Sequence, residues 1–170
     1  MEKRIFITNG VGGCGKDTFA NFLNKHCVVW KTSSIEKVKC IAEYCGWDGG
    51  KTERDRKFLS DLKLLTTEYS DMPFEHIKEQ VARFKNNPIF EVLLIDIREP
   101  EEIERAKYEF DAETILIRNN RIKPITSNMA DANVENYDYD YIIENNGTLE
   151  EFEETVKQFV DLVINEKECK

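Results

Sequence analysis

Residues 10–18 read GVGGCGKDT, a glycine-rich segment between two stretches of different periodicity. Before it, residues 4–8 (RIFIT) have the apolar pattern of a short buried strand. After it, residues 16–26 place Phe19, Phe22 and Leu23 on one face of a helix. A glycine-rich turn between a strand and a helix is the context that a phosphate-binding loop requires.

This loop offers three kinds of phosphate ligand. Its glycines let backbone N–H groups point inward, the helix start adds partial positive charge, and Lys16 is expected to reach the β- and γ-phosphates of a nucleotide. The spacing is that of a Walker A motif, G-x4-G-K, but Asp17 stands where serine or threonine usually follows, and Thr18 supplies a hydroxyl one position later. The alternative is a glycine-rich turn with a surface lysine. The expected nucleotide contacts in the loop are Gly10, Gly12, Gly13, Cys14, Gly15, Lys16, Asp17 and Thr18.

Strand and helix patterns alternate along the rest of the chain. Further strands are expected at 27–31, 89–97, 113–117 and 139–143, and helices at 35–45, 54–70, 73–86, 99–109 and 148–166. Ser33 or Ser34 is expected to cap the helix at 35–45, and Thr148 with Glu151 forms a capping-box pattern. In the helix at 54–70, Phe58, Leu62 and Leu65 are in phase. The alternation predicts one three-layer α/β domain over residues 1–170 with a mostly parallel sheet.

Composition narrows the class of protein. The formal net charge is −9, and an acidic chain repels nucleic acid and anionic membranes, so we expect neither as a partner. Five cysteines without C-x-x-C spacing indicate free thiols in a reducing compartment. The first residues lack the apolar run of a signal peptide, and no run approaches the ~20 residues of a membrane span. We therefore expect a cytoplasmic protein.

A second group of candidate residues follows the most apolar run of the chain. Asp96 and Arg98 end the expected central strand at 89–97, at the edge where open α/β sheets bind ligands. Residues two apart on a strand face the same side. Asp96 is suited to hold Mg²⁺ or orient an acceptor, and Arg98 to bind an acceptor phosphate with its planar fork. The alternative is a strand-end ion pair outside any site.

Several of these motifs resemble those of small-molecule kinases. The sequence GKDT at 15–18 and the D-x-R segment at 96–98 are similar to phage-type deoxynucleoside monophosphate kinases and animal-type phosphomevalonate kinases. Residues 131–147, ending in ENNG, resemble both families, and residues 35–56 resemble the nucleotide kinases. The resemblance implies a P-loop NTPase fold with five parallel strands in the order 2-3-1-4-5. It also implies ATP and Mg²⁺ as cofactors, a helical acceptor-binding region at 35–86 and a short lid at 118–136.

The resemblance also implies roles for residues outside the loop. Arg118 and Arg121 occupy the lid position. Asn145 and Asn146 follow the last strand, and in these kinases the turn at that place commonly borders the adenine of the nucleotide. A solvated charged face and an Asn-Gly turn are the respective alternatives. The expected catalytic residues are Lys16, Asp96, Arg98, Arg118 and Arg121. Acceptor binding is assigned to Ser33, Ser34, Arg56 and Arg98, a further nucleotide contact to Asn146, and metal binding to Thr18 and Asp96.

Two functions follow from this pattern. The first is an ATP-dependent kinase for a small phosphorylated acceptor, with a nucleoside or deoxynucleoside monophosphate as the first candidate and phosphomevalonate as the second. The other is a non-catalytic ATP-binding module that couples nucleotide occupancy to a partner. The region at 35–86 argues against the module, because a pure switch needs no acceptor-binding region.

Overall fold

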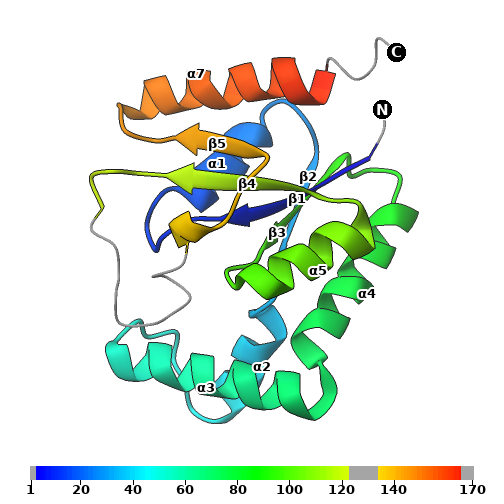
Figure 1. Cartoon of the computed structure of the whole chain (residues 1–170), viewed down its shortest axis with the longest axis vertical. Coiled ribbons are helices and arrows are strands. Elements are labelled where there is room, and N and C mark those ends of the chain that lie inside the picture. The colour runs from blue at the N-terminus through cyan, green and yellow to red at the C-terminus, as the bar shows by residue number, and fades with distance from the viewer. Residues whose placement is uncertain (1–2, 123–133, 166–170) are drawn as a thin grey trace.

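A five-stranded parallel sheet forms the centre of the computed structural model, which describes residues 3–122 and 134–165 (Figure 1). Its order is β2-β3-β1-β4-β5, and all four neighbouring pairs are parallel, which confirms the predicted topology. The strands are β1 (Arg4–Asn9), β2 (Val29–Ser33), β3 (Val92–Asp96), β4 (Glu113–Arg118) and β5 (Tyr141–Glu144).

Helices cover both faces of the sheet, which explains why the central strands are continuously apolar. On one face, Phe6 and Leu94 pack with α1 (Lys16–Leu23) and α7 (Leu149–Phe159). On the other, Ile7 and Ile95 pack with the helices α4 (Met72–Asn86) and α5 (Pro100–Phe110). Figure 1 shows these two helical layers on opposite sides of the strands. The three-layer α/β arrangement is therefore as predicted.

Two helices extend this framework between β2 and α4. They are α2 (Glu36–Tyr44) and α3 (Glu53–Ser70), and α3 packs against α2 and α4 (Figure 1). The apolar phase predicted for this segment is correct in part: Phe58 and Leu62 are half-buried, but Leu65 is 63% exposed and the buried residue is Leu59. A helix that packs on other helices, and not on the broad sheet, needs only a narrow apolar stripe.

The start of β2 and the cap of α2 differ from the predictions. β2 begins two residues later than expected, since the Cys27 amide donates to the Leu23 carbonyl and completes the last turn of α1. The expected serine cap of α2 is absent, and Ile35 is its N-cap residue. The Thr148 capping box is confirmed at the start of α7. Short helical segments η1 (Val134–Asn136) and η2 (Val160–Asn165) complete the described elements.

Within the described ranges, no helix combines the length and apolar character that a membrane span needs. Four of the cysteines, Cys14, Cys27, Cys40 and Cys45, are free thiols. Because the sheet is parallel, the carboxyl ends of β1, β2 and β3 lie at one edge. That edge brings the predicted site residues of three separate segments together.

Candidate active site

The glycine-rich loop joins β1 to α1 in a shape that requires glycine at two positions. Gly10 has φ +148°, and a Cβ there would lie 2.4 Å from the Ile117 carbonyl oxygen. Gly15, the N-cap residue of α1, has φ +108°, and a Cβ there would lie 2.5 Å from Nδ2 of Asn145. Side chains at these positions would therefore meet both strain and direct contact. The loop backbone is held close to β4 and to the turn after β5.

Lys16 begins α1, and its side chain lies back over the loop. Its Nζ donates to the Gly10 carbonyl at 2.6 Å and approaches the Val11 carbonyl at 3.5 Å. Asp17 and Thr18 follow in the first turn of the same helix. The ammonium group, the helix N-terminus and the loop backbone therefore lie together, a combination suited to a phosphate group.

Cys14 contributes packing to the loop. Its side chain is fully buried, burial raises the pKa of its thiol, and a Cβ at Gly10 would lie 2.6 Å from its Sγ. Its amide donates to the Val11 carbonyl at 3.1 Å, and its carbonyl accepts from Asn145 Nδ2 at 2.8 Å. The thiol thus packs against the buried side of the loop, next to Gly10. Sequence reasoning had assigned no packing role to this position.

Asn9, the last residue of β1, is a structural partner of the site that sequence reasoning missed. Gly10 N donates to its side-chain oxygen at 2.8 Å, and its Nδ2 donates to the Tyr139 hydroxyl at 2.8 Å and to the Arg98 carbonyl at 3.3 Å. The side chain is buried. A polar residue at the end of an apolar strand, directly before the glycines, was the available signal. Asn9 fixes the loop start relative to the segment after β3.

Asp96, the last residue of β3, is surrounded by polar partners. The Thr8 hydroxyl donates to its carboxylate, and Lys31 Nζ lies 3.2 Å from Oδ2. The same ammonium also contacts Asp17, whose pKa it lowers through that hydrogen bond. Burial opposes the charge on Lys31, but the attraction of Asp96 and Asp17 outweighs it and raises the pKa of the lysine. Lys31 was also missed, although a lysine at the end of the apolar run CVVWK was a visible irregularity.

Of the predicted acceptor residues, Ser33 and Ser34 lie at the end of β2, beside Asp96. Ser33, at the end of β2, donates to the Asp96 carbonyl at 3.3 Å, while buried Ser34 accepts from Lys63 Nζ at 3.2 Å. Arg56 is in the first turn of α3. Arg98 is half-buried and lies two residues beyond the end of β3, not within the strand.

Lys63 connects α3 to the start of α5. Its Nζ lies 2.6 Å from Glu99 Oε2 and 2.6 Å from Glu102 Oε2. Burial raises the pKa of Glu102 to about 7, with the repulsion of Glu99 adding to burial and the attraction of Lys63 opposing it. For Glu99, burial also disfavours the charge, but Lys63 outweighs it and lowers the pKa. This cluster joins the predicted acceptor region to the segment that follows Arg98.

Of the two arginines predicted for the lid, Arg118 is the last residue of β4 and Arg121 lies in the turn that follows it. Arg118 pairs with Glu135 at 2.6 Å and with Glu144 at 3.2 Å, and the hydrogen bond to Glu135 raises its pKa. Arg121 donates to the Gly147 carbonyl at 2.8 Å. Exposed ion pairs of this kind hold an arginine weakly, by about 0–1 kcal/mol. Most of the predicted lid, residues 123–133, lies outside the described ranges.

Of the two asparagines after β5, Asn145 contacts the phosphate loop. Its Nδ2 donates to the Cys14 carbonyl, whereas Asn146 donates to Glu144 and accepts from the Asn120 amide at 2.7 Å. Asn146 therefore stabilises the turn, and its contact with a nucleotide stays a prediction. Asn145 ties that turn to the loop.

The donor groups available to a metal ion here are oxygens. Thr18 offers a hydroxyl in the first turn of α1, and Asp96 offers a carboxylate at the end of β3. In the part of the chain that is described, no three His, Cys, Asp or Glu side chains form a metal-binding group. A hydroxyl and a carboxylate are donors that suit Mg²⁺, which proteins usually hold through one or two carboxylates together with substrate phosphates and water.

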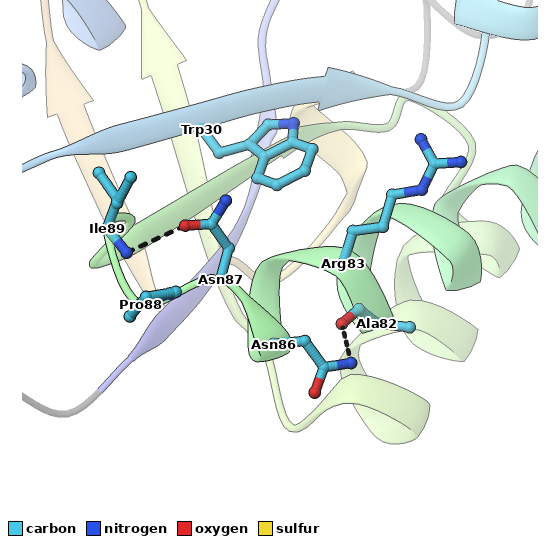
Figure 2. A pocket seen from close by; sticks show the side chains of 7 residues that line it. All are labelled: Trp30, Ala82, Arg83, Asn86, Asn87, Pro88 and Ile89. Atoms are coloured by element: carbon cyan, nitrogen blue, oxygen red, sulfur yellow. Dashed lines mark hydrogen bonds between the residues drawn. The ribbon is translucent and has the colours of Figure 1, made fainter.

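A hollow of about 660 Å³ lies elsewhere on the molecule (Figure 2). Trp30 is the second residue of β2, and residues 87–89 precede β3, so this hollow lies at the amino ends of the strands. Ligands of open parallel sheets bind at the carboxyl ends. We therefore place the candidate site at the phosphate loop. The hollow is lined by Trp30, Ala82, Arg83, Asn86, Asn87, Pro88 and Ile89.

Comparison with known proteins identifies the fold. No protein-family model and no curated protein matches the sequence. Among solved structures, the chain is similar to a sugar kinase from Janibacter sp. HTCC2649, with 10% identity, a TM-score of 0.57 and coverage of 95% of this chain and 96% of that one. It is also similar to shikimate kinase from Aquifex aeolicus, with 13% identity, a TM-score of 0.53 and coverage of 98% and 99%.

A third similar structure is dephospho-CoA kinase from Campylobacter jejuni, with 15% identity, a TM-score of 0.50 and coverage of 94% of this chain and 96% of that one. Each alignment spans nearly the whole of both chains. At these identities the similarity concerns the fold. The chain has the α/β fold of the P-loop small-molecule kinases, with a five-stranded parallel sheet in the order 2-3-1-4-5.

Proposed function

We propose that this protein is an ATP-dependent kinase that transfers the γ-phosphoryl group of ATP to a small phosphorylated acceptor. The observation that carries the proposal is the combination of the strained glycine loop, Lys16 and the Asp96 carboxylate at one edge of a parallel sheet. Each of the three compared structures is named as a small-molecule kinase, which supports the same chemistry.

The side chains divide the work of positioning and charge neutralisation, which is most of what phosphoryl transfer demands of a protein. Lys16 would exchange its hydrogen bond to the Gly10 carbonyl for one to the β- and γ-phosphates. Arg98 would hold the acceptor phosphate, and Arg118, at the end of β4, and Arg121 would supply further positive charge. Thr18 and Asp96 would hold Mg²⁺, which screens phosphate charge and aligns the reacting groups. Exclusion of water by the lid would limit hydrolysis of ATP.

A nucleoside or deoxynucleoside monophosphate is the acceptor that we propose first, with phosphomevalonate as the alternative. The support is the resemblance of residues 35–56 and 96–98 to these kinases, together with the position of α2 and α3 beside the carboxyl ends of β2 and β3 (Figure 1). Ser33, Ser34 and Arg56 belong to this side of the molecule.

A non-catalytic ATP-binding module is the competing hypothesis. It accounts for the loop, but it gives no role to the helices between β2 and α4. A kinase and a module differ in one measurement, the conversion of ATP to ADP that depends on an added acceptor.

The test is an ADP-release assay with a panel of nucleoside and deoxynucleoside monophosphates plus phosphomevalonate. We expect acceptor-dependent turnover with one member or a few related members of the panel. Lys16→Ala should abolish this turnover and leave the fold intact, because Lys16 is a half-exposed residue outside the core. Lys25→Ala is a matched control, since Lys25 lies just after the same helix and pairs with Glu153 away from the loop. Wild-type turnover in Lys16→Ala would disprove the phosphate-loop assignment.

A further inference from the structure

Lys31 is a second lysine beside the phosphate loop, and none of the roles described above requires it. It is the central residue of β2 and is in register with Leu94 of β3. Leu94 belongs to the core beneath α1, so Lys31 lies on the face of the sheet that α1 covers. Its ammonium group reaches Asp17, which directly follows Lys16 in the first turn of that helix.

Two carboxylates hold this ammonium, and they differ in how far they are exposed to solvent. Asp96 is largely buried, with 21% of its side chain exposed, and lies 3.2 Å from Lys31 Nζ. Asp17 is 91% exposed, and such an exposed pair contributes little to stability. Lys31 can therefore leave Asp17 easily while its long, flexible side chain remains in the site.

Lys16 and Lys31 approach the start of α1 from different elements. Lys16 lies over the loop at the Gly10 carbonyl, whereas Lys31 comes from β2, the strand that leads into the predicted acceptor region. A γ-phosphate on the loop would project toward the acceptor side. Its transfer spreads negative charge over three oxygens that need cationic partners.

We propose that Lys31 binds the γ-phosphate of ATP from the acceptor side of the loop, and that Asp17 and Asp96 hold its ammonium ready at this position before the nucleotide arrives. The inference rests on the proposed function, because it presupposes ATP on the loop. It adds a phosphate ligand that the sequence motif does not contain. The test is a comparison of ATP with ADP, since these differ by the group that Lys31 would bind.

Calorimetric titration of the full chain with ATP and with ADP, both with Mg²⁺, measures this contact directly. For Lys31→Met we expect ATP affinity to fall by about ten- to a hundredfold, the loss typical of a charge-assisted hydrogen bond, and ADP affinity to change less than about threefold. Lys31→Arg keeps the charge and should recover part of the difference. Lys107→Met is a matched control, because Lys107 is similarly half-exposed and pairs with Asp140 on another face.

The outcomes separate this inference from the proposed function. Equal losses of ATP and ADP affinity in Lys31→Met would mean that the lysine supports the loop, and unchanged affinities would mean that its ion pairs are incidental. Either result overturns the inference. If the wild-type protein binds ATP but transfers no phosphoryl group to any acceptor, the kinase proposal fails, while the titrations still decide the role of Lys31. If it binds neither nucleotide, both fail.

Discussion

Asn9 shows how a single residue can align separate parts of the candidate site. Its side chain accepts from the Gly10 amide and donates to Tyr139 and to the Arg98 carbonyl. Tyr139 in turn donates to the Val134 carbonyl at 2.9 Å, which lies within the segment 118–136 that the sequence assigns to the lid. The phosphate loop, the segment after β3 and the residues before β5 therefore share one buried hydrogen-bonded group, and buried networks of this kind restrict movement.

Arg98 is the residue on which the acceptor assignment depends most. If it binds the acceptor phosphate with two hydrogen bonds, Arg98→Ala removes about 1.5–3 kcal/mol, or roughly ten- to a hundredfold in acceptor affinity. Arg98→Lys should restore only part, because lysine keeps the charge but lacks the planar fork. The measurements are the KM for the acceptor at saturating ATP and the calorimetric affinity for ATP.

Arg105→Ala is the control for Arg98, since Arg105 lies in α5, the helix that follows Arg98, and pairs with Asp71 instead. We expect this variant to keep the acceptor KM of the wild type. If Arg98→Ala weakens ATP and acceptor binding equally, Arg98 belongs to the ATP-binding side or to the fold, and the acceptor has been placed wrongly.

At the scale of secondary structure elements, the contact between α3 and α5 is the least expected. One lysine of α3, Lys63, is held by Glu99 and Glu102 at the start of α5 and also donates to Ser34 after β2. Two carboxylates share one ammonium, and because Glu102 and Lys63 are largely buried, Glu102 gains from being protonated. The position of the predicted acceptor region is thus linked to a carboxyl group whose pKa is raised by burial to about 7.

This link predicts a pH-dependent contribution to stability. Glu102 has a folded-state pKa of about 7 against 4.5 for the free group, so the folded chain binds a proton that the unfolded chain lacks between these values. The free energy of unfolding should therefore fall as the pH rises from about 4.5 to 7, by on the order of 1–3 kcal/mol. Glu102→Gln is neutral throughout and should become more stable relative to the wild type as the pH rises.

Urea unfolding at intervals from pH 5 to pH 8 measures this difference. Glu101→Gln, a change at the exposed neighbour, is the control and should follow the wild-type pH dependence. Because the pKa of Glu99 is lowered, its own contribution is lost at more acidic pH and does not overlap this window. Parallel curves for wild type and Glu102→Gln would show that the Glu102 carboxyl stays ionised in the folded protein.

At the scale of the whole molecule, the candidate site lies at an edge of the sheet whose strands belong to both hydrophobic clusters. The cluster around Phe6 and Phe159 lies under α1 and α7, and the cluster around Ile95 and Phe84 lies under α4 and α5. β1 and β3 contribute to both clusters and end at the candidate site. A ligand at that edge contacts elements from both layers, so its binding should stabilise the entire fold.

The expected size of this stabilisation follows from mass action. MgATP at a hundred times its dissociation constant should add about 2.7 kcal/mol to the free energy of unfolding. For a chain of this length, that raises Tm by roughly 5–10 °C. Scanning calorimetry with and without MgATP measures the shift, and Lys16→Ala should lose most of it. A wild-type Tm that does not respond to MgATP would contradict nucleotide binding at the loop.

Local patterns account for what could be read from the sequence. The glycines at 10–15 reflect the backbone conformation of a tight loop. The apolar run before Asp96 reflects burial of a strand on both faces, and the alternation of strands and helices is visible in the hydrophobic periodicity. These patterns were sufficient to predict the loop and the three-layer architecture. The strand order was predicted from the resemblance to nucleotide kinases. Leu65 of α3 was wrongly expected to be buried, because periodicity does not tell which neighbour a helix packs against.

The sequence by itself therefore determined the strand, the phosphate loop and the helix that follows it, since these form among residues close together in the chain. The tertiary structure alone placed Lys31 between Asp17 and Asp96, joined Asn9 to Tyr139 across 130 positions and brought Asn145 to the Cys14 carbonyl. Such contacts depend on which strands become neighbours and in what register. No local pattern encodes that, because the energy of a buried polar contact exists only after the sheet has assembled.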